Sequence, residues 1–264
     1  MPFLQYNGLK LHYIDINNQS NVADSNPLLF IHGAGSAHIC WALQIKEFSK
    51  NHRIIAPDLS GHGESERAAG PASIDNGFAH EIDALVNHLN LHDFIMIGHS
   101  MGGGVAMSYV LHNYEVNPKA LVLVDTSPDL ELSKLALGLV KETVDDRIFM
   151  LKCGHYEEYT DACKIKKYED EVRVHHPEIM ERDLAACNKF DIRERVSEVD
   201  IPTFVLVGEH DDIIPPKVAL ELEKRLPHSD IAIVRNAYHS PMIEEPAEFN
   251  RLLQKFILWV GKNA

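Results

Sequence analysis

A serine flanked by glycines is the clearest sign of chemistry in this chain. The segment Gly98-His99-Ser100-Met101-Gly102 follows an apolar run at 94–97 and precedes a helix-like pattern. A G-x-S-x-G sequence between a strand and a helix places its serine on a sharp turn with an exposed hydroxyl. The glycines let the neighbouring chain pass closely, and the helix N-terminus favours developing negative charge. We therefore predict that Ser100 is a nucleophile.

A serine nucleophile needs a base and an acid elsewhere in the chain. Its hydroxyl is weakly reactive at neutral pH until a neighbouring base accepts the proton. His239 follows the last predicted strand, at 231–234, and this position makes it a candidate for the base among the 16 histidines of the chain. Two aspartates, Asp125 and Asp211, each follow a predicted strand, so both satisfy the chain order serine, acid, histidine. The residues alone leave these two open.

The elements that must position these residues alternate between strands and helices. Asn7-Gly8 separates two short strands and is a strong hairpin signal. Helix patterns separate most of the later strands, which are almost continuously apolar, as expected for a parallel sheet covered by helices on both faces. The predicted strands after the hairpin are 28–31, 53–56, 94–97, 120–124, 203–207 and 231–234. Helices are predicted at about 39–49, at 78–89 and from Pro246 onward.

A long helical stretch interrupts this alternation. Between 129 and 190 the sequence has helical stripes, including those at 132–140, 156–165 and 178–187, and no convincing strand. So long a connection is unusual in a compact domain and is typical of an active-site lid. We predict a core formed by 1–128 and 191–264, with 129–190 as a helical cap over the site.

Composition narrows the possible functions. The chain has 264 residues, 45% of them hydrophobic and 24% charged, which is ordinary for a globular protein. A formal charge of −14 disfavours binding to nucleic acid or to an anionic membrane surface. No segment is long and apolar enough to span a bilayer. We predict a cytoplasmic protein with a small-molecule substrate, and the sequence leaves open whether it forms a homodimer.

The cysteines and histidines indicate no metal site. Cys40, Cys153, Cys163 and Cys187 include no C-x-x-C pair, so we interpret them as reduced thiols. His175-His176 together with Cys163 or Cys187 does not match a recognised zinc spacing. The prediction is therefore a protein without metal or other cofactor.

Five motifs in order resemble the α/β-hydrolase superfamily, over nearly all of the chain outside 129–190. They are the G-x-S-x-G segment, His32-Gly33-Ala34-Gly35, the run from Asp58 to Ser65, the run from Gly208 to Pro215, and Ala237-Tyr238-His239. The resemblance implies an α/β fold with a mostly parallel eight-stranded sheet, helices on both faces and a helical cap insertion. The motifs specify substrate much less than fold, because this fold hosts many reactions.

The resemblance also implies roles for individual residues. The triad would be Ser100, Asp211 and His239, with His239 as the base and Asp211 orienting it. The backbone N–H groups of Ala34 and Met101 would form the oxyanion hole.

The same resemblance favours Asp211 over its rivals. Asp211, with Pro215 four residues later, matches the family's acid loop. Asp125 instead precedes a turn-forming run in which an aspartate can bond its own backbone, and Asp212 fits the motif position less well. His62, His99 and Asp58 are interpreted as structural.

The predicted function is a cofactor-free serine hydrolase that cleaves small carboxylic esters through an acyl-enzyme. Serine at the nucleophile position disfavours the dehalogenase and epoxide hydrolase branches, which use aspartate there. An enol-lactonase, a carbon–carbon bond hydrolase, a perhydrolase and a lyase of this fold remain alternatives. The carbon–carbon bond hydrolases tend to carry Gly-Pro-Gly after the first glycine, whereas this chain has Ala34-Gly35-Ser36-Ala37, which lowers that option. A ligand receptor with an intact triad is the alternative from another class.

Overall fold

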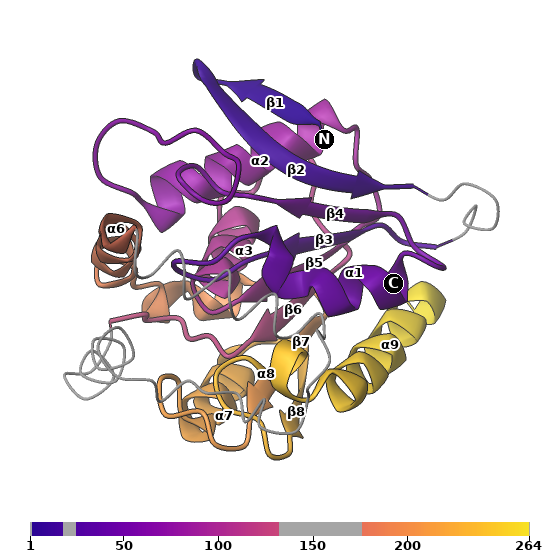
Figure 1. Cartoon of the computed structure of the whole chain (residues 1–264). Coiled ribbons are helices and arrows are strands. Elements are labelled where there is room, and N and C mark those ends of the chain that lie inside the picture. Colours follow the sequence, from indigo (N-terminus) through magenta and orange to yellow (C-terminus); the bar gives the residue numbers. More distant parts are fainter. Residues whose placement is uncertain (1, 18–24, 132–175, 264) are drawn as a thin grey trace, which may run out of the picture.

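The computed structural model describes residues 2–17, 25–131 and 176–263. The strands are β1 (Phe3–Tyr6), β2 (Leu9–Ile16), β3 (Leu28–Ile31), β4 (Ile54–Pro57), β5 (Ile95–His99), β6 (Ala120–Val124), β7 (Thr203–Gly208) and β8 (Ser229–Val234). They form one eight-stranded sheet in the order β1-β2-β4-β3-β5-β6-β7-β8 (Figure 1).

Strand directions match the sequence-based prediction. β1 and β2 pair antiparallel across Asn7 and Gly8, whose positive φ angles of 49° and 81° are those of a tight hairpin turn. β2 also runs antiparallel to β4, and every other neighbouring pair is parallel. The mostly parallel eight-stranded sheet is therefore confirmed.

Helices cover both faces of this sheet. The helical segments are η1 (His38–Trp41), α1 (Ala42–Phe48), η2 (Ile74–Phe78), α2 (Ala79–His88), α3 (Met101–Leu111), α6 (Pro177–Cys187), η3 (Arg193–Glu198), α7 (Pro216–Arg225), α8 (Pro241–Glu244) and α9 (Pro246–Asn263). One buried cluster joins the sheet to α2, α3 and α7, and the other joins it to η1, α1, α8 and α9. In Figure 1, α1 lies in front of the sheet and α3 behind it.

The apolar runs of the sequence explain this arrangement. All four residues of β3 are buried, and Leu28 and Phe30 join one cluster while Leu29 and Ile31 join the other. Successive side chains of a strand point to opposite faces, so a strand buried on both faces must be apolar throughout. The same full burial holds for β5, at the centre of the sheet.

Two helix predictions need correction in detail. The helix expected at about 39–49 begins as the short 3-10 turn η1 and becomes α-helical only from Ala42. Trp41 has φ −97° and ψ 8°, which breaks the helical path between the two. The helix expected at 78–89 is preceded by another turn, η2, capped by the Ser73 hydroxyl. The four-residue helix α8 was not expected from the sequence.

The predicted cap falls mostly outside the described residues. The stripes at 132–140 and 156–165 lie there, whereas the helix expected at 178–187 is present as α6. The boundaries of the cap and its covering of the site stay predictions. None of the described helices combines the length and apolar character needed to cross a membrane.

The chain leaves and re-enters the core at adjacent points, through a short antiparallel stem. Asp129 bridges to Asp191, the N–H of Ile192 donates to the carbonyl of Pro128, and the N–H of Leu130 donates to that of Phe190. Leu130 and Phe190 are buried beside Gly104 of α3, where an added Cβ would crowd both side chains. The stem is thus fastened to the helix that follows the predicted nucleophile.

Candidate active site

Ser100 lies on a strained turn between β5 and α3. Its φ of 51° and ψ of −117° fall outside the regions that L-residues ordinarily occupy. A Cβ added at Gly102 would lie 2.5 Å from the carbonyl oxygens of Ile31 and His32, and one added at Gly98 would collide with the backbone of Gly102. Only glycine fits at these two positions, because Gly98 packs against the start of α3 and Gly102 packs against the end of β3.

The structure brings Ser100, His239 and Asp211 into one hydrogen-bonded line. His239 Nε2 lies 3.1 Å from Ser100 Oγ, and His239 Nδ1 lies 2.8 Å from Asp211 Oδ2. The three residues follow the carboxyl ends of β5, β7 and β8, which meet at one edge of the parallel sheet. The Asp211 side chain is fully buried and that of His239 is 13% exposed. This geometry suits proton transfer from the hydroxyl to the imidazole.

Asp211 is held as a carboxylate. Its Oδ1 accepts hydrogen bonds from the backbone N–H groups of Ile213, at 2.8 Å, and Ile214, at 3.0 Å. Burial acts to raise the pKa of Asp211, but the charge and hydrogen bond of His239, together with hydrogen bonds from Ile214 and Asp125, outweigh it and hold the pKa below its ordinary value. Asp212 is exposed, and the contact to His239 comes from its neighbour Asp211.

Asp125, the rival acid, lies beside the same line. It follows β6 with φ 44° and is fully buried. Its Oδ1 accepts a hydrogen bond of 2.8 Å from the N–H of Gly208, whereas the hydrogen bond of His239 Nδ1 goes to Asp211. Burial and then the nearby Asp211 charge raise the pKa of Asp125 well above its ordinary value. Asp125 therefore places a second buried carboxyl group close to that of Asp211.

The two predicted oxyanion donors border the predicted nucleophile, Ser100. A Cβ added at Gly33 would lie 3.3 Å from Ser100 Cβ, so the loop that holds Ala34 runs directly against the serine. Met101 begins α3, at the positive end of that helix. Neither the N–H of Ala34 nor that of Met101 donates a hydrogen bond to another described residue.

Two buried histidines support the loops without titrating near neutral pH. His99 Nε2 lies 2.7 Å from the carbonyl oxygen of His239, and burial followed by the charge of His239 lowers the pKa of His99 to about 3. His32 Nε2 accepts from the N–H of Leu59, and burial lowers the pKa of His32 to about 4. His99 therefore donates to the backbone of the loop that carries His239, and it remains neutral.

Helix α6 adds a set of contacts that sequence reasoning missed. Asp183 Oδ2 accepts from the N–H of Gly35 at 2.8 Å and lies 2.6 Å from His62 Nε2. Arg182 Nη1 donates to the carbonyl of Ser60 at 2.9 Å. These buried side chains tie α6 to the loop that carries Ala34 and to the loop after β4 that carries Ser60 and His62. No local pattern indicates them, because their partners lie more than a hundred residues away along the chain.

Asp58 is the centre of a second cluster, formed with His12 and the partly buried His38. Its carboxylate accepts from the backbone N–H groups of His38 and Glu64 and contacts the imidazoles of His12 and His38 at 2.7 and 2.8 Å. Although burial acts to raise the pKa of Asp58, these hydrogen bonds hold it far below its usual range. Direct bonding among these groups supports a structural role for the cluster.

The metal site that the sequence disfavoured has little support among its described members. His176 is exposed at the start of α6 and Cys187 is buried at its end, about 16 Å away at 1.5 Å per residue. Burial also raises the pKa of the Cys187 thiol, which disfavours the thiolate that zinc needs. His175 and Cys163 lie outside the described residues.

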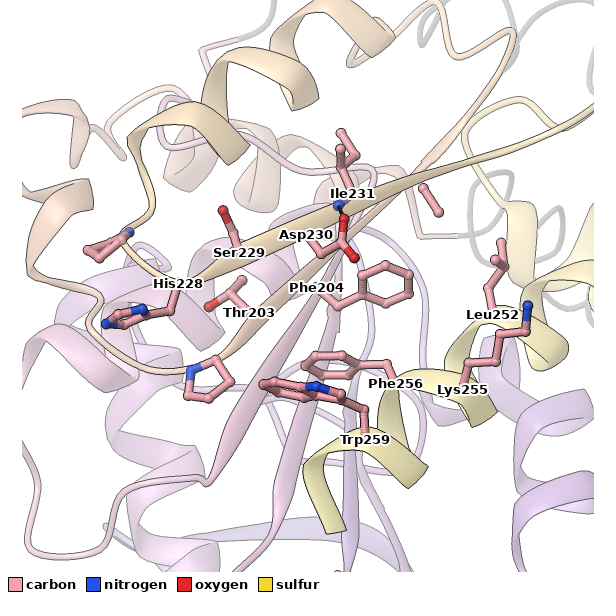
Figure 2. Close-up of a pocket in the computed structure, with 13 residues that line it drawn as sticks. Thr203, Phe204, His228, Ser229, Asp230, Ile231, Leu252, Lys255, Phe256 and Trp259 are labelled. Carbon is pink, nitrogen blue, oxygen red and sulfur yellow. Dashed lines mark hydrogen bonds between the residues drawn. The ribbon is translucent and has the colours of Figure 1, made fainter. Parts of the chain in front are cut away.

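A cavity of about 560 Å³ lies far from the triad (Figure 2). Thr203 and Ser229, at the amino ends of β7 and β8, line one side of it. Phe256 and Trp259 of α9 line the other with stacked rings. Because the triad follows the carboxyl ends of the same strands, this cavity is at the opposite end of the sheet.

Known proteins match the chain over most of its length. A family model described as "Alpha/beta hydrolase family" matches residues 28–252. The AB hydrolase superfamily protein YisY of Bacillus subtilis (strain 168) is 26% identical, covering 93% of this chain and 98% of that protein. The pimeloyl-[acyl-carrier protein] methyl ester esterase of Aliivibrio salmonicida (strain LFI1238) is 25% identical, covering 89% and 93%. The solved structure of a thermophilic esterase aligns at TM-score 0.78 and 27% identity, covering 98% of both chains.

Proposed function

We propose that this chain, which belongs to the alpha/beta hydrolase family, is a serine hydrolase of small carboxylic esters. The observation that carries the proposal is the continuous line from Ser100 Oγ through His239 to Asp211, with distances of 3.1 and 2.8 Å. A relative named as a methyl ester esterase and a solved thermophilic esterase favour esters as the substrate class.

The proposed reaction begins at Ser100. Its Oγ attacks the ester carbonyl while His239 Nε2 accepts the proton, and Asp211 stabilises the resulting imidazolium. The oxyanion forms beside the N–H groups of Ala34 and Met101, which are preorganised to receive it. His239 returns the proton to the leaving alcohol, and an acyl group remains on Ser100.

Water then completes the cycle. His239 accepts a proton from a water molecule that attacks the acyl-enzyme, and the acid leaves as Ser100 recovers its proton. Each step uses groups of this chain and water, so a chelator should leave turnover unchanged.

The segment 129–190 is proposed as the cap that shapes the substrate pocket.

The test combines kinetics with covalent labelling. We expect multiple turnovers on short p-nitrophenyl esters, and Ser100→Ala should reduce turnover by about six orders of magnitude, as loss of a triad nucleophile does. An organophosphonate should label Ser100. Ser127→Ala is the matched control, because Ser127 is another buried serine at the same edge of the sheet. It should keep both turnover and labelling.

Other outcomes would redirect the proposal. Labelling at a serine other than Ser100 would overturn the assignment of the nucleophile. Turnover of lactones or dienone acids but not of simple esters would leave the nucleophile in place and change the substrate class. A single slow turnover that alters affinity for a partner protein would favour the receptor alternative.

A further inference from the structure

Asp125 and Asp211 place two carboxyl groups in one buried space. Both side chains are buried, and carboxyl oxygens of the two, together with a ring nitrogen of His239, lie within 4.8 Å of one another. Two carboxylates so close and so shielded from water cannot both be ionised without a large cost. One of the pair must therefore hold a proton.

Hydrogen bonding decides which carboxyl is neutral. Asp211 receives three donors, from the N–H groups of Ile213 and Ile214 and from His239 Nδ1, and these stabilise its anion. Asp125 receives one donor, the N–H of Gly208, at its Oδ1. The proton therefore belongs on Asp125.

The remaining oxygen of Asp125 locates that proton. Asp125 Oδ2 is buried and has no hydrogen-bond partner among the described residues. An ionised carboxylate can only accept hydrogen bonds, so an oxygen facing another carboxylate stays unpaired until one of the two is protonated. A proton on Oδ2 supplies the missing bond and leaves no buried polar atom of Asp125 unsatisfied.

We propose that Asp125 is a neutral carboxylic acid that donates its O–H to the Asp211 carboxylate and so positions the proposed catalytic acid. Asp211 then accepts four hydrogen bonds, which is the capacity of its two oxygens. The inference rests on the proposed function, because it assigns Asp125 a role behind the triad. Asp125 is a positioning residue, since it acts on His239 only through Asp211.

The surrounding charges agree with this assignment. The groups that act on Asp125 are Asp211 from the loop after β7, His239 from the loop after β8 and Glu244 from α8. Burial is the largest influence, followed by the charge of Asp211, and both raise the pKa of Asp125. A single negative charge therefore faces His239 from this pair.

The backbone at Asp125 provides a matched substitution. Its φ of 44° is in the left-handed region, which asparagine tolerates better than most residues. In Asp125→Asn the amide oxygen can accept from Gly208 and the amide NH₂ can donate to Asp211, so both bonds of a neutral Asp125 are reproduced. Asp125→Ala removes both bonds.

Kinetics against pH separates a neutral from an ionised Asp125. If Asp125 is neutral, Asp125→Asn should keep kcat within about threefold and leave the acid-limb pKa of kcat/KM unchanged, whereas Asp125→Ala should lower kcat about tenfold or more. If Asp125 is ionised, the same Asn substitution removes a charge about 5 Å from His239. The acid-limb pKa would then fall by about 2 at an effective dielectric constant of about 20. That fall would overturn the proposal.

Infrared spectroscopy tests the same point without substrate. The wild-type protein at neutral pH should show the carbonyl stretch of a neutral carboxylic acid, and this band should vanish in Asp125→Asn while persisting in the exposed variant Asp212→Asn. If the Asp125→Asn variant keeps every carboxylic acid band of the wild type, the inference is refuted. Because the measurement needs no turnover, it tests the protonation of Asp125 even if the protein does not hydrolyse esters. Failure of this inference and failure of the proposed function can therefore be told apart.

Discussion

Acid sensitivity should originate partly in His99. The residue is only 7% exposed, and its Nε2 donates to the carbonyl oxygen of His239 at 2.7 Å. Glutamine at this position can present an amide N–H at about the same place, so His99→Gln keeps the donor and removes the titration. The substitution therefore isolates the cost of protonating a buried imidazole.

The magnitude follows from the two pKa values. Burial, then the charge of His239, lower the pKa of His99 from 6.5 to about 3 in the folded protein. Because the folded pKa is the lower one, the unfolded state binds more protons between these values, and stability falls as pH decreases through that window. At about pH 5, some 1.5 pH units below the unfolded value, the loss is about 2 kcal/mol at 1.36 kcal/mol per unit.

Denaturant unfolding at two pH values measures this loss. Between about pH 7.5 and pH 5, the free energy of unfolding of wild type should fall by about 2 kcal/mol more than that of His99→Gln. His92→Gln, at an exposed histidine, is the matched control and should fall as wild type does. Equal falls for wild type and His99→Gln would refute the reasoning that His99 is neutral in the folded state.

Three further predictions test the site and its supports. Asp211→Asn should lower ester turnover by about 10⁴-fold through the wrong imidazole tautomer, whereas Asp212→Asn should change it little; a dead Asp212→Asn variant would contradict the triad. Gly102→Ala should lower the free energy of unfolding by more than about 2 kcal/mol, because backbone oxygens lie 2.5 Å from the added carbon. The control Gly261→Ala, in the open last turn of α9, should raise the free energy of unfolding by up to about 1 kcal/mol. If Gly102→Ala changed the free energy of unfolding as Gly261→Ala does, the close packing at Gly102 would be refuted. Asp183→Ala should lower kcat about tenfold or more by releasing the N–H of Gly35 beside the oxyanion loop, whereas Glu178→Ala on the exposed face of α6 should not; an unchanged kcat in both would remove α6 from the site.

The sheet and the position of Ser100 could be predicted because both depend on local sequence. Apolar runs of four to six residues mark buried strands wherever helices cover both faces, and β3 begins and ends where the run at 28–31 does. The glycines at 98 and 102 reflect a close passage of the backbone that no other residue permits. In both cases the structural requirement, burial or close backbone contact, selects the type of the very residue at which it acts.

The choice between two acids depends on geometry that the sequence does not contain. Asp125 and Asp211 follow neighbouring strands at the same edge of the sheet, and only the direction of each side chain separates them. The left-handed backbone at Asp125 directs its Oδ1 to Gly208, while Asp211 faces His239. The neutral state that we infer for Asp125 arises from this proximity, so no motif could indicate it.

The contacts of α6 were invisible for a different reason. Asp183 and Arg182 lie in a helix whose pattern alone predicts solvent-facing charges, yet both are buried against loops that follow β3 and β4. A single sequence records neither the distance nor the burial of such partners. The turn η1 was missed because Trp41 interrupts the helix without any breaking residue.

The stem formed by 128–130 and 190–192 has a consequence for how this protein can diversify. Because the backbone bonds of the stem already hold the two chain ends together, residues added between them lengthen a loop that is closed. Loop-closure entropy grows only with the logarithm of length, so a doubling costs about 0.6 kcal/mol. Exchange of the residues between the stem and α6, with Arg182 and Asp183 of α6 retained, would therefore leave the sheet and the turn at Ser100 intact. The stem makes that stretch a replaceable module, in which new specificities can arise by recombination as well as by point mutation.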